Sequence, residues 1–376
     1  MKILLLGNSL HSMIKFRWDI IKYLANNHHQ IYIICPLDVE NYKLKYQHEN
    51  VFFLNINFCR SINIVKDLAT LFQFKKIIKK INPDVIFSYS LKSSFFSMVD
   101  NWKIPNVYFI TGVGSSLINK YKFFIEKIIY TLTHLRKLII KHPDFFIFLN
   151  NDDRNYFIKK NLCSKKYAMV FPGEGVDLEF YKFSPINEHK KTISFLFIGR
   201  LIKDKGIIEL MNACKKLKSS QIQFHCTVIA PFDHHNPSSL HSMNVDDFQK
   251  IGIEYFSYVD DVRTYINACD VIVLPSYSEG MPRVLLEGMA MGRAIITTDT
   301  HGCRELVHRD NGILVKPKDM QSLYNAMVCL SKKTRDELSQ MGLAGYRYVK
   351  EKYSLLNVIN SYQVLINDLI QLKEGN

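Results

Sequence analysis

The chain has 376 residues, of which 47% are hydrophobic, and a formal net charge of +14. A length beyond about 250 to 300 residues favours two domains with separate cores. No stretch approaches the roughly 18 uninterrupted apolar residues that a membrane-spanning helix needs, and the apolar run at 3–6 is too short for a secretory signal. We therefore expect a cytoplasmic protein that is soluble or peripheral on a membrane.

The cysteines support this expectation. None belongs to a Cys-x-x-Cys pair, and none has a neighbouring set of histidine ligands. They fall singly at positions 35, 59, 163, 214, 226, 269, 303 and 329. Reduced thiols, as in the cytosol, are the expected state.

The positive charge is concentrated in the first half. Residues 1–184 hold 26 Lys and Arg against 14 Asp and Glu, a net charge of +12, which leaves +2 for the rest. Such a field suits an anionic partner of the first half: nucleic acid, an anionic membrane surface or a phosphate-bearing substrate. A Lys-rich solvated face without a partner is the alternative.

Short apolar runs recur along the chain at intervals that leave room for helices, and most lack a period-two alternation. This is the pattern of parallel strands that are buried on both faces. In the first half the runs are 3–6, 31–35, 51–54, 85–89, 107–110, 145–149 and 168–171, and in the second half 192–198, 225–229, 271–274 and 294–297. The chain therefore reads as two α/β domains with parallel sheets.

Between the strands lie helical patterns, such as 206–217, where Ile207, Leu210, Cys214 and Leu217 share one face. The polar segment 183–191, which contains Pro185, is the best linker. We expect domains at 1–184 and 185–354, with a C-terminal helix at about 355–376 that packs back on the first domain.

The loop after the strand at 192–198 carries groups that suit phosphate. Gly199 lets a ligand approach the backbone, Arg200 offers a planar fork, and Lys205 adds a charge near the start of the next helix. The pattern predicts a diphosphate clamp; a surface arginine is the alternative.

Two carboxylates follow the strand at 271–274. Glu279 precedes a helix in which we place Pro282 in the first turn, and Glu287 lies more than a turn inside that helix. The two side chains can therefore contact different parts of an elongated ligand. For Glu287 alone, a solvent-facing helix residue is the alternative.

These motifs resemble a known family. Glu-x7-Glu after an apolar strand, preceded by Gly-Arg-Leu-x-x-x-Lys-Gly, is similar to the donor domain of the retaining glycosyltransferases of family 4, whose GT-B fold has two facing Rossmann-like domains. The segments 297–299 and 302–305 and the turn Gly-Val-Asp at 175–177 also follow the family pattern.

The resemblance implies a role for each matching residue of the second half. Arg200 and Lys205 would bind the donor diphosphate and stabilise its departure, Glu279 would hold the transferred sugar, and Glu287 would bind ribose. Gly199 belongs to the same clamp. Gly280, Met281 and Pro282 would offer backbone amides around sugar and phosphates, and Val259 would contact the uracil base of a UDP-linked donor.

In the first half the chain resembles a bacterial subgroup that assembles O-antigen, capsule and glycoprotein glycans, including N-acetylgalactosaminyl transferases that act on undecaprenyl-diphosphate-linked sugars. Gly7-Asn-Ser replaces the family's Gly-Gly loop, and Arg17 opens the first helix as in the subgroup. Lys92 follows a strand, and Thr111-Gly112-Val-Gly matches a Thr-Gly-Leu-Gly turn. The resemblance implies that these residues bind acceptor or phosphate groups.

The segment 120–141 interleaves Phe, Ile and Leu with Lys and Arg, as in a basic amphipathic helix at a membrane surface. A core helix with one solvated side is the alternative. A lipid-linked saccharide acceptor and the basic first half favour an anionic inner-membrane surface as partner, with the protein on its cytoplasmic face.

No Asp-x-Asp occurs, so the resemblance implies metal-independent transfer without a cofactor, in which Arg200 and Lys205 replace a metal ion. The expected reaction is retaining transfer of an N-acetylhexosamine from a UDP-sugar in O-antigen or capsule synthesis. A nucleotide-sugar 2-epimerase on the same fold stays open as an alternative. A dehydrogenase is disfavoured because 112–117 lacks a third glycine, and a nucleic-acid-binding protein is disfavoured because no such motif occurs.

Overall fold

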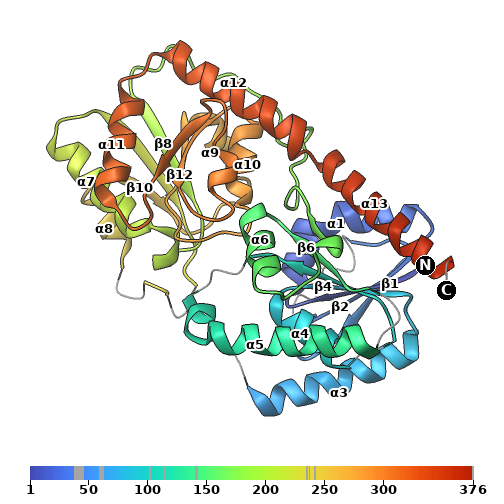
Figure 1. Ribbon diagram of the computed structural model, residues 1–376. Coiled ribbons are helices and arrows are strands. Elements are labelled where there is room, and N and C mark those ends of the chain that lie inside the picture. The colour runs from blue at the N-terminus through green and yellow to red at the C-terminus, as the bar shows by residue number, and fades with distance from the viewer. Residues whose placement is uncertain are drawn as a thin grey trace. The chain divides into compact units, whose positions relative to one another are not determined.

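The structure is a computed structural model that describes residues 1–37, 46–58, 63–100, 103–112, 116–139, 143–233, 236, 238–240 and 243–374. The chain divides into two units, each built on one sheet. It leaves the first unit at Glu174–Gly175 and returns to it at Val358–Ile359. The two units are coloured in chain order in Figure 1.

The first unit contains a seven-stranded parallel sheet in the order β3-β2-β1-β4-β5-β6-β7. Its strands are β1 (Lys2–Gly7), β2 (Gln30–Cys35), β3 (Val51–Asn55), β4 (Val85–Tyr89), β5 (Asn106–Ile110), β6 (Phe145–Phe148) and β7 (Ala168–Val170). Its helices are α1 (Leu10–Asn26), α3 (Ile64–Ile81), α4 (Leu91–Asp100), α5 (Ser116–Ile139), α6 (Asn151–Lys159) and the 3-10 turn η1 (Lys165–Tyr167).

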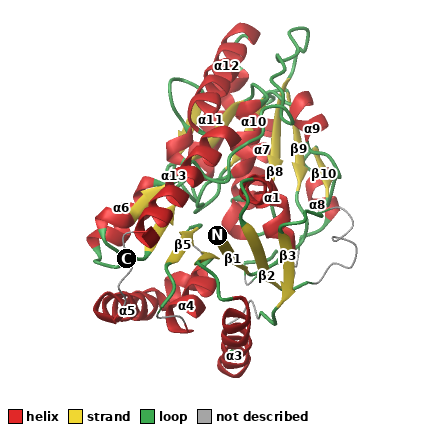
Figure 2. Ribbon diagram, turned by 90° about the vertical axis from the view of Figure 1, so that its right-hand side faces the viewer, coloured by secondary structure: helices red, strands yellow, loops and turns green. Residues whose placement is uncertain are grey.

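Helices α3, α4 and α5 cover one face of this sheet (Figure 2). The strand register puts Leu6, Ser88, Tyr108 and Phe146 in one row on that face. Buried side chains of the three helices, Phe74, Phe96 and Ile129 among them, pack against the same face. The outer sides of these three helices therefore form the surface of the first unit on this face of the sheet.

The second unit contains a six-stranded parallel sheet in the order β10-β9-β8-β11-β12-β13. Its strands are β8 (Ile193–Ile198), β9 (Phe224–Ile229), β10 (Ile253–Phe256), β11 (Val271–Leu274), β12 (Ala294–Thr298) and β13 (Gly312–Val315). Its helical elements are η2 (Lys203–Lys205), α7 (Ile207–Ser219), α8 (Val245–Gln249), α9 (Arg263–Ala268), α10 (Arg283–Ala290), η3 (Arg304–Leu306), α11 (Met320–Ser331) and α12 (Arg335–Lys352).

The predicted α/β class with two parallel sheets is confirmed, and every predicted strand is present within a residue or two of its expected bounds. The central strands β4, β5, β11 and β12 are buried along their whole length, which explains why their sequences lack alternation. Helix α7 buries the predicted apolar face, with Gly206 as its N-cap.

The chain enters the second unit ahead of the boundary expected at residue 184, because the residues before that point already contact the second unit. Val176 pairs with Ser354, and Tyr181 packs in the core of the second sheet. Ser184 accepts a hydrogen bond from Arg293, at 2.8 Å. The expected linker 183–191 is thus part of the second unit.

Helix α13 (Leu355–Glu374) belongs to the first unit from Ile359 onward. The Tyr362 hydroxyl lies 3.0 Å from that of Tyr89, and its ring stacks on Phe109 at 5.6 Å. Lys373 pairs with Asp84 at 2.7 Å. The last helix therefore completes the core of the first unit.

Candidate active site

The centre of the second sheet offers the position at which open α/β sheets bind ligands. From β8 the chain first builds β9 and β10 on one side, and then β11 and β12 on the other. The connections therefore leave β8 and β11 in opposite directions, the arrangement at whose carboxyl ends open α/β sheets bind ligands. The loops that follow these two strands carry Lys205 and Glu279, respectively.

The loop after β8 is fixed against the loop after β11 by backbone contacts. Gly206 has a left-handed φ of 72°, and a Cβ atom at this position would lie 2.0 Å from the carbonyl oxygen of Pro275. The carbonyl oxygen of Asp204 accepts hydrogen bonds from the Ser276 hydroxyl at 3.1 Å and from the Tyr277 amide at 2.8 Å. Only glycine fits at 206, and the contacts set the position of the neighbouring Lys205.

Lys205 and Glu279 form an ion pair across the two loops. Their side chains keep 19% and 13% of their exposure, so a ligand can still reach both. Gly199 lies beside them, since a Cβ atom built there would be 3.9 Å from Cγ of Lys205. The structure thus brings together three of the residues that the sequence assigns to the donor.

The backbone around Glu279 is held by a third loop, which follows β12. Gly302 has a φ of 72°, and a Cβ atom there would lie 2.3 Å from the carbonyl oxygen of Gly280 and 2.6 Å from that of Glu279. The neighbouring Cys303 is fully buried, and burial together with the charge of Glu279 raises the pKa of its thiol to about 11. The thiol is therefore protonated at neutral pH and is no nucleophile.

Helix α10 begins directly after the loop that follows β11. Pro282 is its N-cap, with an extended ψ of 104°, so the prediction that it lies in the first turn is wrong by one position. Because proline has no N–H group, it also cannot offer the expected amide. Gly280 and Met281 remain as the candidates for amide contacts in this segment.

Glu287 is not the solvent-facing residue of the alternative interpretation. It is 8% exposed and accepts a hydrogen bond from Nε of Arg283, at 3.0 Å, one helical turn earlier. The Tyr181 hydroxyl lies close to this carboxylate: burial, and then the charge of Glu287, raise the pKa of Tyr181. The carboxylate is therefore oriented by Arg283 and lies close to Tyr181.

Arg200 lies apart from the ion pair of Lys205. Its side chain is 53% exposed and donates from Nη1 to Oδ2 of Asp233 at 2.7 Å. The guanidinium has five N–H donors, so it can bind a phosphate while Nη1 keeps Asp233. Val259 lies in the loop after β10, where it packs partly buried against the core, beside the exposed Tyr258.

In the first unit, Arg17 is buried at the carboxyl ends of β1 and β4. It is 5% exposed, forms an ion pair with Glu174 and lies over the ring of Tyr89 with 4.3 Å to the centroid. Nη1 donates to the carbonyl oxygen of Ser12 at 3.2 Å. A phosphate could reach this guanidinium only by displacing Glu174.

The other acceptor candidates lie at the same sheet edge. Gly7 ends β1, and a Cβ atom there would lie 2.6 Å from the sulfur of Met13. Lys92 opens α4 and pairs with Asp67 of α3 at 2.7 Å. Thr111 and Gly112 follow β5 and are partly exposed, whereas the next residues, 113–115, lie outside the described ones.

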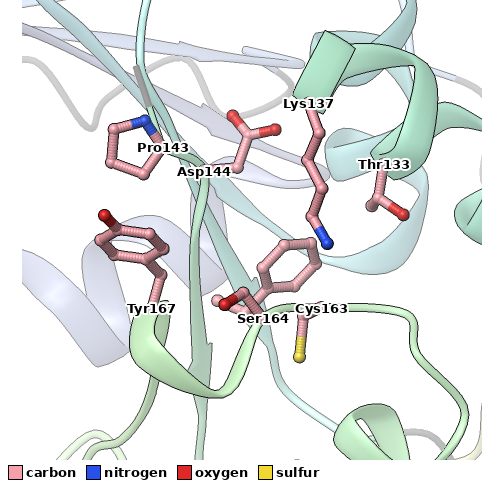
Figure 3. A pocket seen from close by; sticks show the side chains of 8 residues that line it. Thr133, Lys137, Pro143, Asp144, Cys163, Ser164 and Tyr167 are labelled. Atoms are coloured by element: carbon pink, nitrogen blue, oxygen red, sulfur yellow. The ribbon is translucent and has the colours of Figure 1, made fainter. Parts of the chain in front are cut away.

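A separate small pocket opens at the other edge of the first sheet, where β6 begins (Figure 3). It is lined by Thr133, Lys137, Pro143, Asp144, Phe146, Cys163, Ser164 and Tyr167. Ligands of parallel sheets bind at the carboxyl ends of the strands. This pocket is therefore not part of the candidate active site.

Among the residues that the structure describes, no three His, Cys, Asp or Glu side chains gather into a group that could hold a metal ion. No helix of the described chain combines the length and apolar character needed to cross a membrane.

Comparison with known proteins identifies the family. A family model described as "Glycosyl transferases group 1" matches residues 192–333, and one described as "Glycosyl transferase 4-like" matches residues 2–142. The chain belongs to the family 4 glycosyltransferases. This glycosyltransferase thus carries the predicted family signature in both units.

Two relatives of the glycosyltransferase come from bacteria. The N,N'-diacetylbacillosaminyl-diphospho-undecaprenol alpha-1,3-N-acetylgalactosaminyltransferase of Campylobacter jejuni is 29% identical over 365 residues, 92% of each chain. The UDP-Gal:alpha-D-GlcNAc-diphosphoundecaprenol alpha-1,3-galactosyltransferase of Escherichia coli is 26% identical over 291 residues, 72% of each chain.

A solved structure shows the same fold. The Anabaena protein Alr3699/HepE, in complex with UDP and glucose, has a TM-score of 0.75 and 17% identity, and the match covers 98% of this chain and 99% of that one. The GT-B assignment of the glycosyltransferase is thereby confirmed.

Some residues around the site are not apparent from the sequence. Tyr181 lies close to Glu287 although 106 positions separate them in the chain, and Asp233 pairs with Arg200 across 33 positions. Arg283 could have been found, because it stands four residues before Glu287 on the same helix. Gly302 is also visible in the sequence, within the segment that follows the family pattern.

Proposed function

We propose that this glycosyltransferase moves an N-acetylhexosamine from a UDP-sugar to a polyprenyl-diphosphate-linked saccharide, with retention of configuration, in the synthesis of a bacterial surface polysaccharide. The observation that carries the proposal is the ion pair of Lys205 and Glu279 at the carboxyl ends of β8 and β11. It sets a cation and a carboxylate side by side, as a sugar joined to a diphosphate requires.

The donor is divided between these groups. Lys205 has three N–H donors, so it can keep Glu279 and bind a phosphate oxygen at the same time. Glu279 accepts hydrogen bonds from hydroxyls of the transferred sugar, and Glu287 accepts from the ribose diol. Gly199, Gly280 and Met281 lie along the phosphates and sugar, and Val259 contacts the base.

In the proposed reaction the acceptor hydroxyl attacks the anomeric carbon on the face from which the diphosphate leaves. The bond between the anomeric carbon and the phosphate oxygen breaks, and the leaving phosphate takes the hydroxyl proton. Lys205 stabilises the charge that builds on the diphosphate, and Arg200 adds to this with its remaining N–H donors. The chemistry needs no metal ion, so a chelator should leave the rate unchanged.

The first unit takes the acceptor. Lys92, Gly7, Thr111 and Gly112 lie at the carboxyl edge of its sheet and suit a diphosphate-linked saccharide, and Arg17 joins them if phosphate displaces Glu174. The C. jejuni and E. coli relatives are both named for undecaprenol-linked acceptors and an alpha-1,3 linkage. Such an acceptor would bring the enzyme to the cytoplasmic face of the inner membrane, where its basic first unit suits anionic lipid.

The test is a transfer assay with purified protein, a panel of UDP- and other nucleotide sugars, and undecaprenyl-diphosphate-linked monosaccharides, read by mass spectrometry. We expect a product one N-acetylhexosamine heavier, with the anomeric configuration of the donor by NMR. An inverted linkage would overturn the retaining assignment. A converted nucleotide sugar in the absence of acceptor would favour the 2-epimerase instead.

A further inference from the structure

Helix α3 exposes a row of large apolar side chains that nothing in the described structure covers. Ile64, Val65, Leu68 and Phe72 are 74%, 77%, 51% and 67% exposed. At 100° per residue they fall in one sector of the helix, opposite the buried Thr70 and Phe74. We name these four residues the apolar ridge. Contiguous exposed apolar surface of this kind marks an interaction site.

The same outward face becomes basic in the second half of the helix. Lys75 and Lys79 continue the sector of the apolar ridge, and Lys76 and Lys80 flank it; all four are exposed. The one acidic residue of the helix, Asp67, is paired with Lys92. The outward face of α3 thus joins an apolar half to a half of strong positive charge.

We infer that this face docks on an anionic lipid bilayer, with the apolar ridge inserted among the acyl chains and the four lysines against the phosphates. A helix with one apolar and one cationic part binds such a surface both by burying apolar area and by electrostatic attraction. Each lysine near the membrane surface adds to the electrostatic attraction. A soluble protein partner would match the apolar ridge, but would need a dense acidic patch opposite the lysines.

The inference rests on the proposed function, because it gives the lipid-linked acceptor a route to the site. Since α3 follows β3, its first turns lie at the carboxyl edge of the sheet, where the acceptor candidates lie. The ion pair between Asp67 of α3 and Lys92 of α4 links the helix that bears the apolar ridge to this edge. Lys92 also lies near the rings of Phe58 and Phe96, at 5.6 and 5.8 Å. The acceptor diphosphate, at the level of the lipid headgroups, therefore meets Lys92.

Helix α5, which holds most of the basic amphipathic segment of the sequence, is placed differently. Among its described side chains, at 126–139, the most exposed apolar ones are Leu138 and Ile139 in the last turn, with Leu135 one turn before. That turn precedes β6 and lies at the amino edge of the sheet, away from Lys92. The segment's remaining side chains at 120–125 and 140–141 lie outside the described ones. We therefore assign the bilayer contact to α3.

The test is flotation of the full-length protein with vesicles of phosphatidylglycerol and phosphatidylcholine. The variant carries Ile64→Gln, Val65→Gln, Leu68→Gln and Phe72→Gln, because glutamine preserves helix propensity at these exposed positions. The matched control carries Leu135→Gln, Leu138→Gln and Ile139→Gln on α5. We expect the α3 variant to bind at least about tenfold more weakly and the α5 control to bind within about twofold of the parent chain.

A second variant, with Lys75, Lys76, Lys79 and Lys80 changed to Gln, should lose the preference for phosphatidylglycerol over pure phosphatidylcholine. Undiminished binding of the α3 variant, or an equal loss in the α5 control, would overturn the inference. So would self-association of the parent chain, abolished by the α3 changes, without any vesicle binding.

Transfer to a water-soluble acceptor with a short lipid chain separates this inference from the proposed function. The α3 variant should transfer to it at the parental rate, which also shows that it is folded. If the parent chain transfers to no acceptor, the proposed function fails, while the flotation result still decides the role of α3.

Discussion

Nζ of Lys205 forms an ion pair with the carboxylate of Glu279, which joins the loop after β8 to the loop after β11. The two residues are 74 positions apart in the chain. Their contact depends on Gly206, which lets the first loop lie against the backbone of Pro275. The ion pair at the centre of the site thus depends on the backbone packing of the two loops that carry it.

Replacing Lys205 tests the electrostatic part. We expect Lys205→Ala to lower kcat by about 10²- to 10³-fold, the usual effect of removing one group that stabilises developing charge. Lys203→Ala is the matched control, because Lys203 is an exposed lysine of the same 3-10 turn. Steady-state kinetics with a saturating acceptor measure both. Equal rates for the two variants would refute the role of Lys205.

Replacing Tyr181 tests how Glu287 is held. Tyr181→Phe removes a hydroxyl that lies close enough to Glu287 for the carboxylate charge to raise the pKa of Tyr181, so the affinity for UDP should fall by about three- to tenfold, the net worth of one hydrogen bond. Calorimetric titration with UDP measures the change. In a double-mutant cycle, Tyr181→Phe should add little to Glu287→Gln, since both changes break the same contact. Full additivity would show that Tyr181 acts elsewhere.

Replacing Gly206 tests the backbone packing. Gly206→Ala should lower the free energy of unfolding of the second unit by more than about 3 kcal/mol, because a left-handed φ of 72° and a clash at 2.0 Å combine. Gly252→Ala is the control: its φ of 81° is equally strained, but nothing lies within 4 Å of the added Cβ. It should cost only about 1 kcal/mol. If urea unfolding gives the same loss of unfolding free energy for both variants, the clash at residue 206 is excluded.

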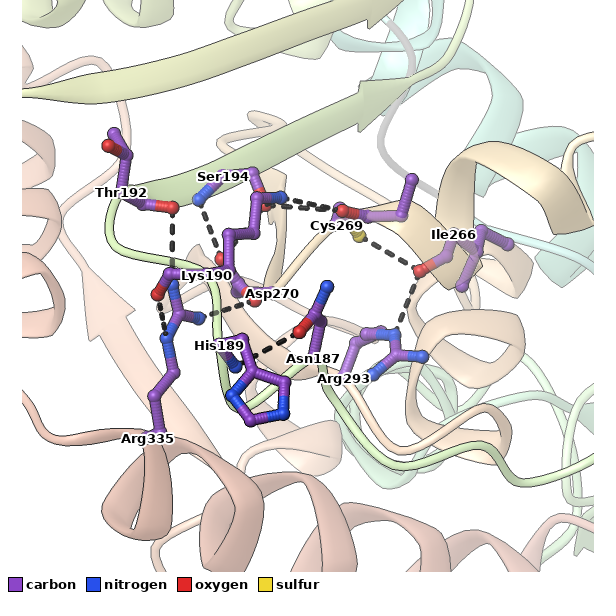
Figure 4. Close-up of polar contacts among 11 residues, drawn as sticks. Asn187, His189, Lys190, Thr192, Ser194, Ile266, Cys269, Asp270, Arg293 and Arg335 are labelled. Carbon is purple, nitrogen blue, oxygen red and sulfur yellow. Dashed lines mark hydrogen bonds and ion pairs between the residues drawn. The ribbon is translucent and has the colours of Figure 1, made fainter.

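Replacing Asp270 tests the anchor of the segment before β8 (Figure 4). Asp270 is 2% exposed, pairs with Arg335 at 2.7 Å and accepts from the amide and hydroxyl of Ser194 at 2.8 and 2.9 Å. Asp270→Ala removes the buried carboxylate that pairs with Arg335, whose side chain is 19% exposed, and leaves the Ser194 amide without this acceptor, so it should destabilise by about 3 kcal/mol. Asp19→Ala, which breaks the exposed pair with Lys22, should change stability by less than about 0.5 kcal/mol. A small effect at both positions would contradict this expectation.

The sequence predicts the central strands well, because burial on both faces makes them continuously apolar. The runs at 85–89 and 271–274 coincide with β4 and β11. It misses β10 and β13, which are short edge strands with exposed residues such as Glu254 and Leu314. An edge strand needs no continuous apolar run, so the pattern that finds central strands misses these two, although it finds β3 and β7 at the edges of the first sheet.

For the site, the sequence supplies residue types and their strand ends, but not their partners. The joining of Lys205 to Glu279 follows from the adjacency of β8 and β11, which the order of elements alone makes plausible. The burial of Glu287 against Tyr181 and the turn of Arg200 toward Asp233 depend on packing between distant segments. No local pattern encodes these contacts.

Helix α13 has a consequence for how the protein is made. Its Tyr362 packs against Phe109 and Phe171 and bonds to Tyr89, all in the first unit. A ribosome that has synthesised residues 1–174 has therefore not yet produced the side chains that close the first core. The second unit, by contrast, ends its own segment at Val358 and can close earlier. The part of the protein that is synthesised first is the part that is finished last.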